Sequence, residues 1–472
     1  MDRRFVRHLH PGGACHHNTH MSEAVAQQNP STVRDFPDRL PPMMVKELRQ
    51  GLRARLFGET VAGFHLVLLV LLFPMLHFGQ ASEVAGAQRL LWWIFTGVLV
   101  LLLPLRGLSA LIQERRENTL DTLLLTNLSA GRIVWGKWLA IASQIAVAGI
   151  SLIPYTIILY AAGGISLTEN LTTLLRLGML GLTLTAAYVA LSWHASWLWR
   201  TGPALILTGL ALTQGAGPMI RSLTGGGPMP GEAGLVRLLA ETAGAAALIY
   251  LLLEGASGRL GPWTEDHRTG PQRLGLALPL LLAAGAGHAA WQEVLGPVAL
   301  AGLTLVSLSA LTAPWPPPRA IPRQGWQPWR HAGHGWPYGI AWAMVAWSLL
   351  LLVMERWLPA HQQAVTLQLM AWLFTGRLLL FCFPESKRNS AAALLGTGLI
   401  LLLGQAALLL AADLLNLPAL RTAATAIPGG MAGMGSPHPA MGWIAGSAAA
   451  LCGVLALVAV GRHRPDRQEG GL

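Results

Sequence analysis

Long apolar runs separated by short polar segments repeat along the whole chain. Most runs are roughly 18–23 residues long, which is enough for an α-helix to cross the hydrocarbon core of a bilayer. The alternation of apolar and polar positions that marks the strands of a membrane barrel is absent. Because lipid offers no partner for a free backbone N–H or C=O group, spanning segments must be helices or closed barrels. The pattern therefore predicts an all-α polytopic membrane protein.

We expect about twelve transmembrane helices in two six-helix halves. In the first half, the expected spans are Val61–Phe78, Leu90–Leu111, Leu139–Tyr160, Leu177–Leu198, Ala204–Ile220 and Leu235–Leu253. In the second half, they are Leu274–Trp291, Val298–Leu311, Tyr338–Met354, Val365–Phe383, Ala391–Ala412 and Gly442–Val460. The runs Ala204–Ile220 and Val298–Leu311 are short or rich in glycine and polar residues, so a count of about ten stays open.

Lysine and arginine are distributed unevenly over the loops between these spans. With a cytoplasmic N-terminus, the loops on the opposite side carry only Arg89, Arg176, Arg221, Arg356 and Arg421. Cytoplasmic loops of membrane proteins are enriched in lysine and arginine. Both termini are therefore predicted to be cytoplasmic, in a multi-pass protein of the cell (inner or plasma) membrane.

The polar segments divide the chain further. Residues 1–42 lack periodicity and are rich in histidine and proline, which predicts a disordered cytoplasmic tail. Residues 43–57 combine a leucine face with basic residues, which predicts an amphipathic interfacial helix or simply the basic flank of the first span. A six-span unit at 58–253, a cytoplasmic loop at 254–273, a C-terminal half at 274–460 and a cytoplasmic tail at 461–472 follow. A Pro/Trp-rich loop at 313–337 interrupts the C-terminal half.

The composition supports the membrane class and excludes others. Only 12% of the residues are charged, whereas a soluble domain carries about 25%. A net charge of +11 could suit nucleic acid in a soluble protein. Here the basic residues mark cytoplasmic loops, so we expect contact with membrane lipids and none with nucleic acid. The cysteines Cys15, Cys382 and Cys452 are far apart and predict neither a disulfide framework nor a metal site.

One polar segment, Gln113–Lys137, differs from the others in its capping and leucine pattern. Asn118 is a good N-cap residue, Asp121 stands three positions later as in a shortened capping box, and the leucines around them share one helical face. Ser129 can cap a second helix that continues into the third span. The segment therefore predicts a cytoplasmic helix–turn–helix elbow, which either docks a soluble partner or lies on the membrane.

The elbow resembles the signature of ABC-2 type transporter permeases, in the loop between their second and third spans. The residues that carry the resemblance are Glu114, Thr119, Leu120, Asp121, Leu123, Leu124, Thr126, Leu128, Ser129, Gly136 and Lys137. Asn118 replaces the family's usual glycine and Asn127 its usual proline, and both are compatible with turns. Lys46, Glu47 and Leu48 are similar to the family's interfacial elbow helix. The resemblance covers about Met43–Leu253, and the C-terminal half contains no second copy of the signature.

The resemblance implies an ATP-driven transporter in which a separate cytoplasmic ABC ATPase docks on the elbow. It favours export over import. That partner would bind ATP and magnesium, so this chain is not expected to be an enzyme or to need a cofactor or metal. Leucines would fill a groove on the ATPase and charged residues would pair at its rim. The implied coupling positions are Glu114, Arg115, Arg116, Glu117, Thr119, Leu120, Asp121, Leu124 and Thr126. The substrate, and whether a second permease chain joins this one, stay open.

Other residues bear on competing functions. The string Gly131–Lys137 matches most of a phosphate-binding loop, but Trp138 replaces its hydroxyl residue and no strand precedes it. Arg237 and Glu241 are four positions apart and can pair on one helix face. Arg377 stands well inside an apolar run, so these three residues either line a substrate path or pair structurally. A secondary (ion-coupled) transporter and a non-transporting anchor or assembly subunit remain as alternatives.

Overall fold

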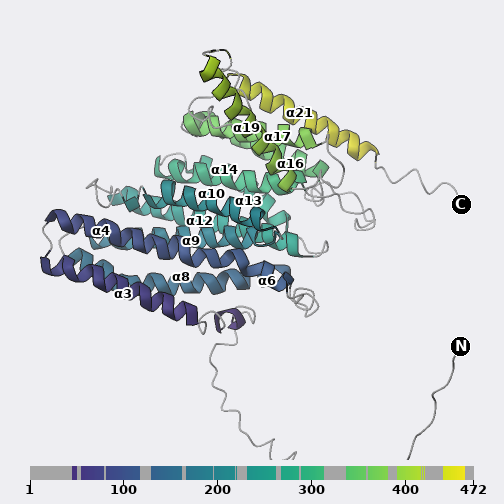
Figure 1. Ribbon diagram of the computed structural model, residues 1–472. Coiled ribbons are helices and arrows are strands. Elements are labelled where there is room, and N and C mark those ends of the chain that lie inside the picture. The colour runs from purple at the N-terminus through teal and green to yellow at the C-terminus, as the bar shows by residue number, and fades with distance from the viewer. Residues whose placement is uncertain are drawn as a thin grey trace, which may run out of the picture. The chain divides into compact units, whose positions relative to one another are not determined.

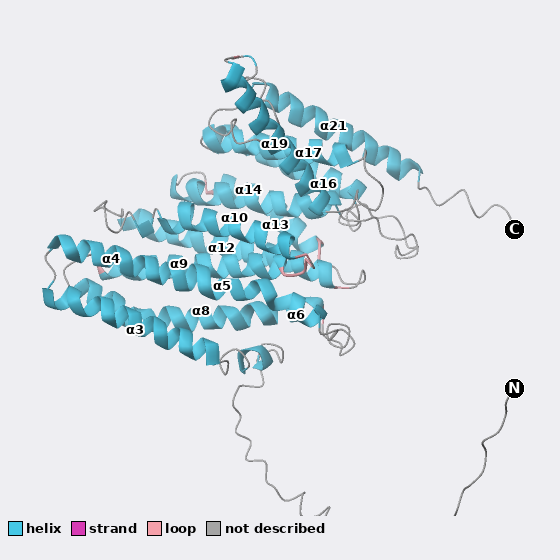
Figure 2. Cartoon of the chain, viewed as in Figure 1, coloured by secondary structure: helices cyan, strands magenta, loops and turns pink. Residues whose placement is uncertain are grey.

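The computed structural model describes most of the predicted spans. The described residues are 45–49, 55–78, 81–116, 129–161, 166–194, 196–217, 219–220, 231–261, 267–285, 289–312, 336–357, 360–380, 391–415, 417, 419 and 439–462, all within one unit, Pro41–Leu472. Every regular element in these ranges is helical (Figure 2). The predicted all-α class is therefore confirmed for this part of the chain. The predicted tail at 1–42, and most of the loop at 313–337 and of the tail at 461–472, lie outside it.

Helices overlap every predicted apolar run (Figure 1). The N-terminal half contains α3 (Arg55–Phe78), α4 (Ala81–Thr96), the π-helix η1 (Gly97–Leu102), α5 (Leu103–Leu105), the 3-10 helix η2 (Arg106–Ser109), α6 (Ala110–Arg116), α8 (Ala130–Ala161), α9 (Leu167–Leu191), α10 (Trp197–Leu210), the π-helix η3 (Ala211–Ala216) and α12 (Gly231–Leu260). The C-terminal half contains α13 (Thr269–Ala284), α14 (Ala289–Thr312), α16 (Trp336–Trp357), α17 (Ala360–Leu380), α19 (Ala391–Leu415) and α21 (Pro439–Arg462).

Within the described residues, 5 helical segments are long and apolar enough to cross a membrane: Gln88–Ile112, Ala130–Ala161, Leu167–Leu191, Leu235–Leu260 and Glu293–Thr312. Shorter helical segments that are also apolar lie at Val61–Phe73, Gly339–Val353, Ala393–Gln405 and Ile444–Ala456. These segments indicate a membrane protein. The count of about twelve spans and the cytoplasmic placement of the termini stay predictions.

Several helices extend beyond the predicted spans. Helix α9 begins at Leu167 rather than near Leu177, so Arg176, which we expected in a loop, lies inside a helix. Helix α12 continues to Leu260 and α13 begins at Thr269, which leaves little of the expected loop at 254–273. Hydropathy marks only the apolar part of a helix, whereas the backbone hydrogen bonds of the helix continue through its polar ends.

A single helical path runs from α4 to α6, and its geometry changes where proline interrupts it. Pro104 has no N–H group and its ring crowds the preceding turn, and the chain forms the π-helix η1 just before it. The N–H of Leu103 donates to the carbonyl of Val98, one residue further back than in an α-helix. The carbonyl of Leu99 then lies against Gly181 of α9, where a Cβ atom would approach the oxygen to 2.2 Å. Glycine is therefore required at this crossing.

The buried apolar side chains form two clusters, and α12 contributes to both. Leu253 belongs to the cluster built by helices α3 to α12, and Leu251 to the cluster built by helices α12 to α21. Helix α12 packs against α8 and α9 on one side and against α14 on another. A Cβ at Gly244 would meet Val298 of α14 at 2.8 Å, so this helix pair also depends on a small residue. Helix α12 thus joins the two halves.

Replacing Gly181 by alanine is expected to lower the stability of the folded protein by about 1–3 kcal/mol, because the new methyl group would collide with backbone that cannot move aside. The matched control is Gly178→Ala on the same helix, where a Cβ would have nothing within 4 Å. Thermal melting of the detergent-solubilised variants measures the difference. Equal melting temperatures for the two variants would contradict the assigned crossing of η1 and α9.

Candidate functional site

The two ends of the predicted elbow are described, and they have the expected helical form. Helix α6 ends at Arg116 and α8 begins at Ala130. Ser129 caps α8: its hydroxyl accepts a hydrogen bond from the N–H of Arg132 at 3.4 Å, and its carbonyl accepts one from Ile133 at 3.3 Å. The predicted cap at Ser129 is therefore confirmed. The predicted coupling residues Glu117, Thr119, Leu120, Asp121, Leu124 and Thr126 lie outside the described residues, as does the cap at Asn118.

A cluster of three charged side chains fastens these helix ends together. The Nζ of Lys137, in the second turn of α8, lies 2.9 Å from a carboxylate oxygen of Glu114 at the end of α6. It also lies 3.0 Å from a carboxylate oxygen of Glu47, in the short helical segment at 45–49. The side chains of Lys137 and Glu114 are only 6% and 8% exposed. A buried charge is tolerated where a group of opposite charge lies within hydrogen-bonding distance. Here the ammonium group of Lys137 and the carboxylates of Glu114 and Glu47 meet this condition.

This cluster changes the expected role of Glu114. The sequence placed Glu114 among the charges at the rim of a docked partner, but its side chain is buried and paired with Lys137. It therefore holds the elbow's base instead of offering a surface charge. Arg116, at the last position of α6, is exposed. The side chain of Arg115 lies outside the described ones.

The near match to a phosphate-binding loop is helical throughout. Gly131–Lys137 forms the first turns of α8, and the lysine that would contact a phosphate is engaged by Glu114 and Glu47. A phosphate-binding loop needs a non-helical turn whose N–H groups converge on the ligand. The string thus opens a helix, as the cap at Ser129 predicts, and this helix is a candidate membrane span.

A second charged cluster lies between α9, α12 and α14. Arg237 pairs with Glu241 at 3.1 Å, as the four-residue spacing predicts. The other carboxylate oxygen of Glu241 lies 2.6 Å from the Nε of Arg176, which is only 5% exposed. Arg237 also approaches Glu293 of α14 at 3.8 Å. Sequence reasoning missed Arg176 because it counted this residue as part of a loop.

Arg377 lies on α17 and is among the largest fully buried side chains of the described residues. Helix α17 packs against α19 and α21. On α21, the thiol of Cys452 contacts the carbonyl of Phe374, one turn before Arg377. The roles suggested for Arg377, Arg237 and Glu241 in lining a substrate path stay predictions.

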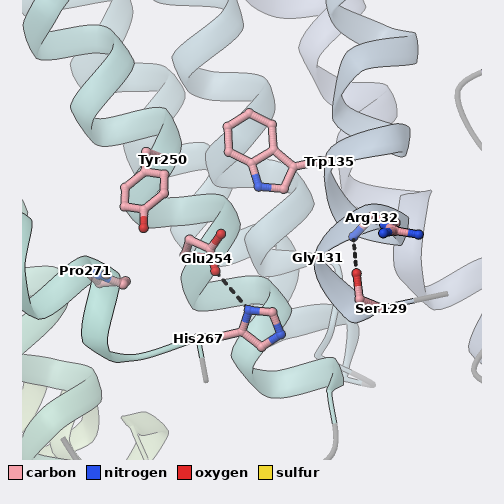
Figure 3. Close-up of a pocket in the computed structure, with 9 residues that line it drawn as sticks. Ser129, Gly131, Arg132, Trp135, Tyr250, Glu254, His267 and Pro271 are labelled. Carbon is pink, nitrogen blue, oxygen red and sulfur yellow. Dashed lines mark hydrogen bonds and ion pairs between the residues drawn. The ribbon is translucent and has the colours of Figure 1, made fainter. Parts of the chain in front are cut away.

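A cavity of about 450 Å³ opens beside the first turns of α8, between α8, the end of α12 and the start of α13 (Figure 3). Its lining consists of Ser129, Gly131, Arg132, Trp135, Tyr250, Glu254, His267, Gly270 and Pro271. The imidazole Nδ1 of His267 and a carboxylate oxygen of Glu254 lie 2.9 Å apart. Sequence reasoning missed this cavity, although the four-residue spacing of Tyr250 and Glu254 puts both on one helix face.

No family model, no curated protein and no solved structure matches this chain.

Replacing Lys137 by methionine is expected to lower stability by about 3–5 kcal/mol, because it removes the buried ammonium group that both carboxylates share. The control is Lys46→Met, which removes an exposed lysine next to Glu47. Melting temperatures in detergent compare the two. The paired exchange Lys137→Glu with Glu114→Lys should recover part of the loss. Equal melting of Lys137→Met and Lys46→Met would show that the cluster contributes nothing.

Proposed function

We propose that this chain is the membrane-spanning permease subunit of an ATP-driven exporter, and that a separate cytoplasmic ATPase docks on the elbow at 113–137. One observation supports this proposal most directly. Three separate parts of the sequence that resemble ABC-2 permeases meet at the ammonium group of Lys137: Glu114 opens the elbow signature, Lys137 closes it, and Glu47 comes from the basic helix before the first span. The positions that carry the resemblance are thus in direct contact with one another, in one ion cluster.

The ion cluster suggests how a docked partner could act on the spans. The end of α6 and the second turn of α8 are held by the contact between Glu114 and Lys137. The residues between them, 117–128, would receive the push of the ATPase. A push on a segment whose two ends are joined moves both helices together, because the buried pair resists separation. Helices α6 and α8 lead into the candidate spans Gln88–Ile112 and Ala130–Ala161, so the movement would reach the membrane.

In this proposal, ATP and magnesium belong to the partner. The chain contributes the membrane pathway, with about twelve spans and both termini in the cytoplasm. The elbow contributes leucines for the partner's groove and the exposed charge of Arg116 for its rim.

One observation favours the runner-up, a secondary transporter. The candidate spans contain more paired charge than the sequence indicated, since Arg176 and Glu241 form a pair at 2.6 Å between α9 and α12. Ionisable groups in such positions mark ion and proton pathways in many transporters. The arrangement of Arg176, Glu241 and Arg237 also satisfies its own charges, which is what a structural pair requires. A non-transporting anchor would leave both the elbow and this pair without a transport role.

Reversing the charge of the elbow tests the proposal. The double variant Arg115→Glu with Arg116→Glu is expected to reduce co-purification of the ATPase with the tagged chain by at least about tenfold, as for charged pairs at a partner's rim. The control is Arg89→Glu, because Arg89 is exposed at the other end of the same candidate span. Recovery is measured by mass spectrometry and by ATP hydrolysis in the eluate.

Three results of this experiment would contradict the proposal. The first is that no ATP-hydrolysing subunit accompanies the wild-type chain from native membranes. The second is that the double elbow variant recovers as much ATPase as the wild type. The third is substrate movement in vesicles that follows a proton or sodium gradient and ignores ATP, which would favour the secondary transporter.

A further inference from the structure

The cavity beside α8 has one wall of aromatic side chains and one acidic group. Trp135 comes from the second turn of α8, and Tyr250 and Glu254 come from successive turns of α12 (Figure 3). Gly270 allows this arrangement, because a Cβ at that position would lie 2.1 Å from the hydroxyl of Tyr250. At Gly131 of α8, a Cβ would only reach ordinary van der Waals contact with His267, at 3.5 Å. Gly270 is thus the glycine that leaves space for Tyr250.

The acidic group is held in place by one of its two oxygens. His267 engages Oε2 of Glu254 at 2.9 Å, and Figure 3 shows the second carboxylate oxygen on the side of Trp135 and Tyr250. When the imidazole is neutral, it can donate its Nδ1 proton to Oε2 and the pair keeps the single negative charge of the carboxylate. The glutamate side chain is 18% exposed and the histidine side chain 13%. The carboxylate is therefore fixed in orientation and partly shielded from water.

The other charged lining residue does not neutralise this carboxylate. Arg132 is exposed, and in Figure 3 its guanidinium is directed away from Trp135 and Glu254. A carboxylate beside a tryptophan and a tyrosine is the chemistry that binds organic ammonium groups: the ring faces attract the cation, and the acid supplies the opposite charge. A volume of about 450 Å³ lies within the usual range of small-ligand sites.

The position of the cavity fits a ligand from the membrane surface. Its walls lie near the start of the candidate span Ala130–Ala161 and near the end of Leu235–Leu260. Ends of spans meet the headgroups of the lipids, where tryptophan and tyrosine are also favoured. Ammonium groups are present there in ethanolamine and choline headgroups, and in the adjacent water as soluble amines.

We propose that this cavity binds an organic ammonium group, with Glu254 as its counter-charge and Trp135 and Tyr250 as its aromatic wall. His267 acts as a positioning residue that orients the carboxylate. This inference does not depend on the proposed transport function, because it rests only on the geometry of the cavity and on its place at the ends of candidate membrane spans. It assigns a ligand to a surface between α8 and α12, next to the elbow.

Binding is measured on the full chain with two sources of the same group. In one arm, the protein is placed in nanodiscs of phosphatidylglycerol with or without phosphatidylethanolamine or phosphatidylcholine, and retained lipids are counted by native mass spectrometry. In the other arm, choline chloride or ethanolamine hydrochloride is added in detergent, and the melting temperature is compared with that in sodium chloride at equal ionic strength. Glu254→Gln is expected to weaken binding at least about tenfold, since it removes the counter-charge.

Two further variants keep the test valid if Glu254→Gln folds poorly. Trp135→Phe retains an aromatic face and should bind nearly as the wild type, whereas Trp135→Leu should bind about two- to tenfold more weakly. Glu59→Gln, which changes an exposed acid on α3, is the matched control and should leave binding unchanged. The melting temperature of each variant without ligand reports its folding separately.

The outcomes distinguish the sources and can overturn the proposal. Selective retention of ethanolamine or choline lipids, lost in Glu254→Gln, supports a headgroup ligand. A rise in melting temperature with soluble amines, also lost in that variant, supports a small amine ligand. If neither source binds better than its reference, or if Glu254→Gln and Trp135→Leu bind as the wild type does, the cavity has no ammonium site and its aromatic residues are only interfacial.

Discussion

Charged side chains among apolar helices need an opposite charge close by, and this requirement decides which distant segments of the chain meet. An unpaired ion in such surroundings costs several kcal/mol. Lys137 meets the requirement with Glu114 and Glu47 at 2.9 and 3.0 Å, and Arg176 meets it with Glu241 at 2.6 Å. Each contact joins different helices. The base of the elbow and the crossing of α9 with α12 therefore depend on electrostatic pairing as well as on apolar packing.

Helix α12 is the element on which the two halves converge. Its residues enter both hydrophobic clusters, and it packs on α8 and α9 as well as on α14. Polar groups occur at two levels along it. Glu241 pairs with Arg176 in the first part of the helix, and Tyr250 and Glu254 face the cavity in the last part. Helix α12 can therefore connect the two halves and also contribute to two polar sites, because residues at different positions of the helical repeat point to different faces.

The first turns of α8 take part in both proposed activities. Ser129 and Trp135 line the cavity, and Lys137, half a turn later, enters the ion cluster at the base of the elbow. A movement of these turns would alter the cavity and the cluster together. If a partner on the elbow alters the affinity of the cavity, a ligand in the cavity alters the affinity of the elbow by the same factor. The arrangement gives a partner on the elbow and a ligand in the cavity a common element to act on.

The sequence determined the helices of this protein, because apolar length and the cap at Ser129 are local properties of the chain. It also determined the pairing of Arg237 with Glu241, which needs only a spacing of four residues on one helix. The packing of the helices was needed to show that Glu114 is buried against Lys137, that Arg176 of α9 pairs with Glu241 of α12, and that His267 meets Glu254 beside α8. These contacts join separate helices, and local periodicity holds no information about which helix faces which. The packing of side chains, with glycine at the closest crossings, makes that choice.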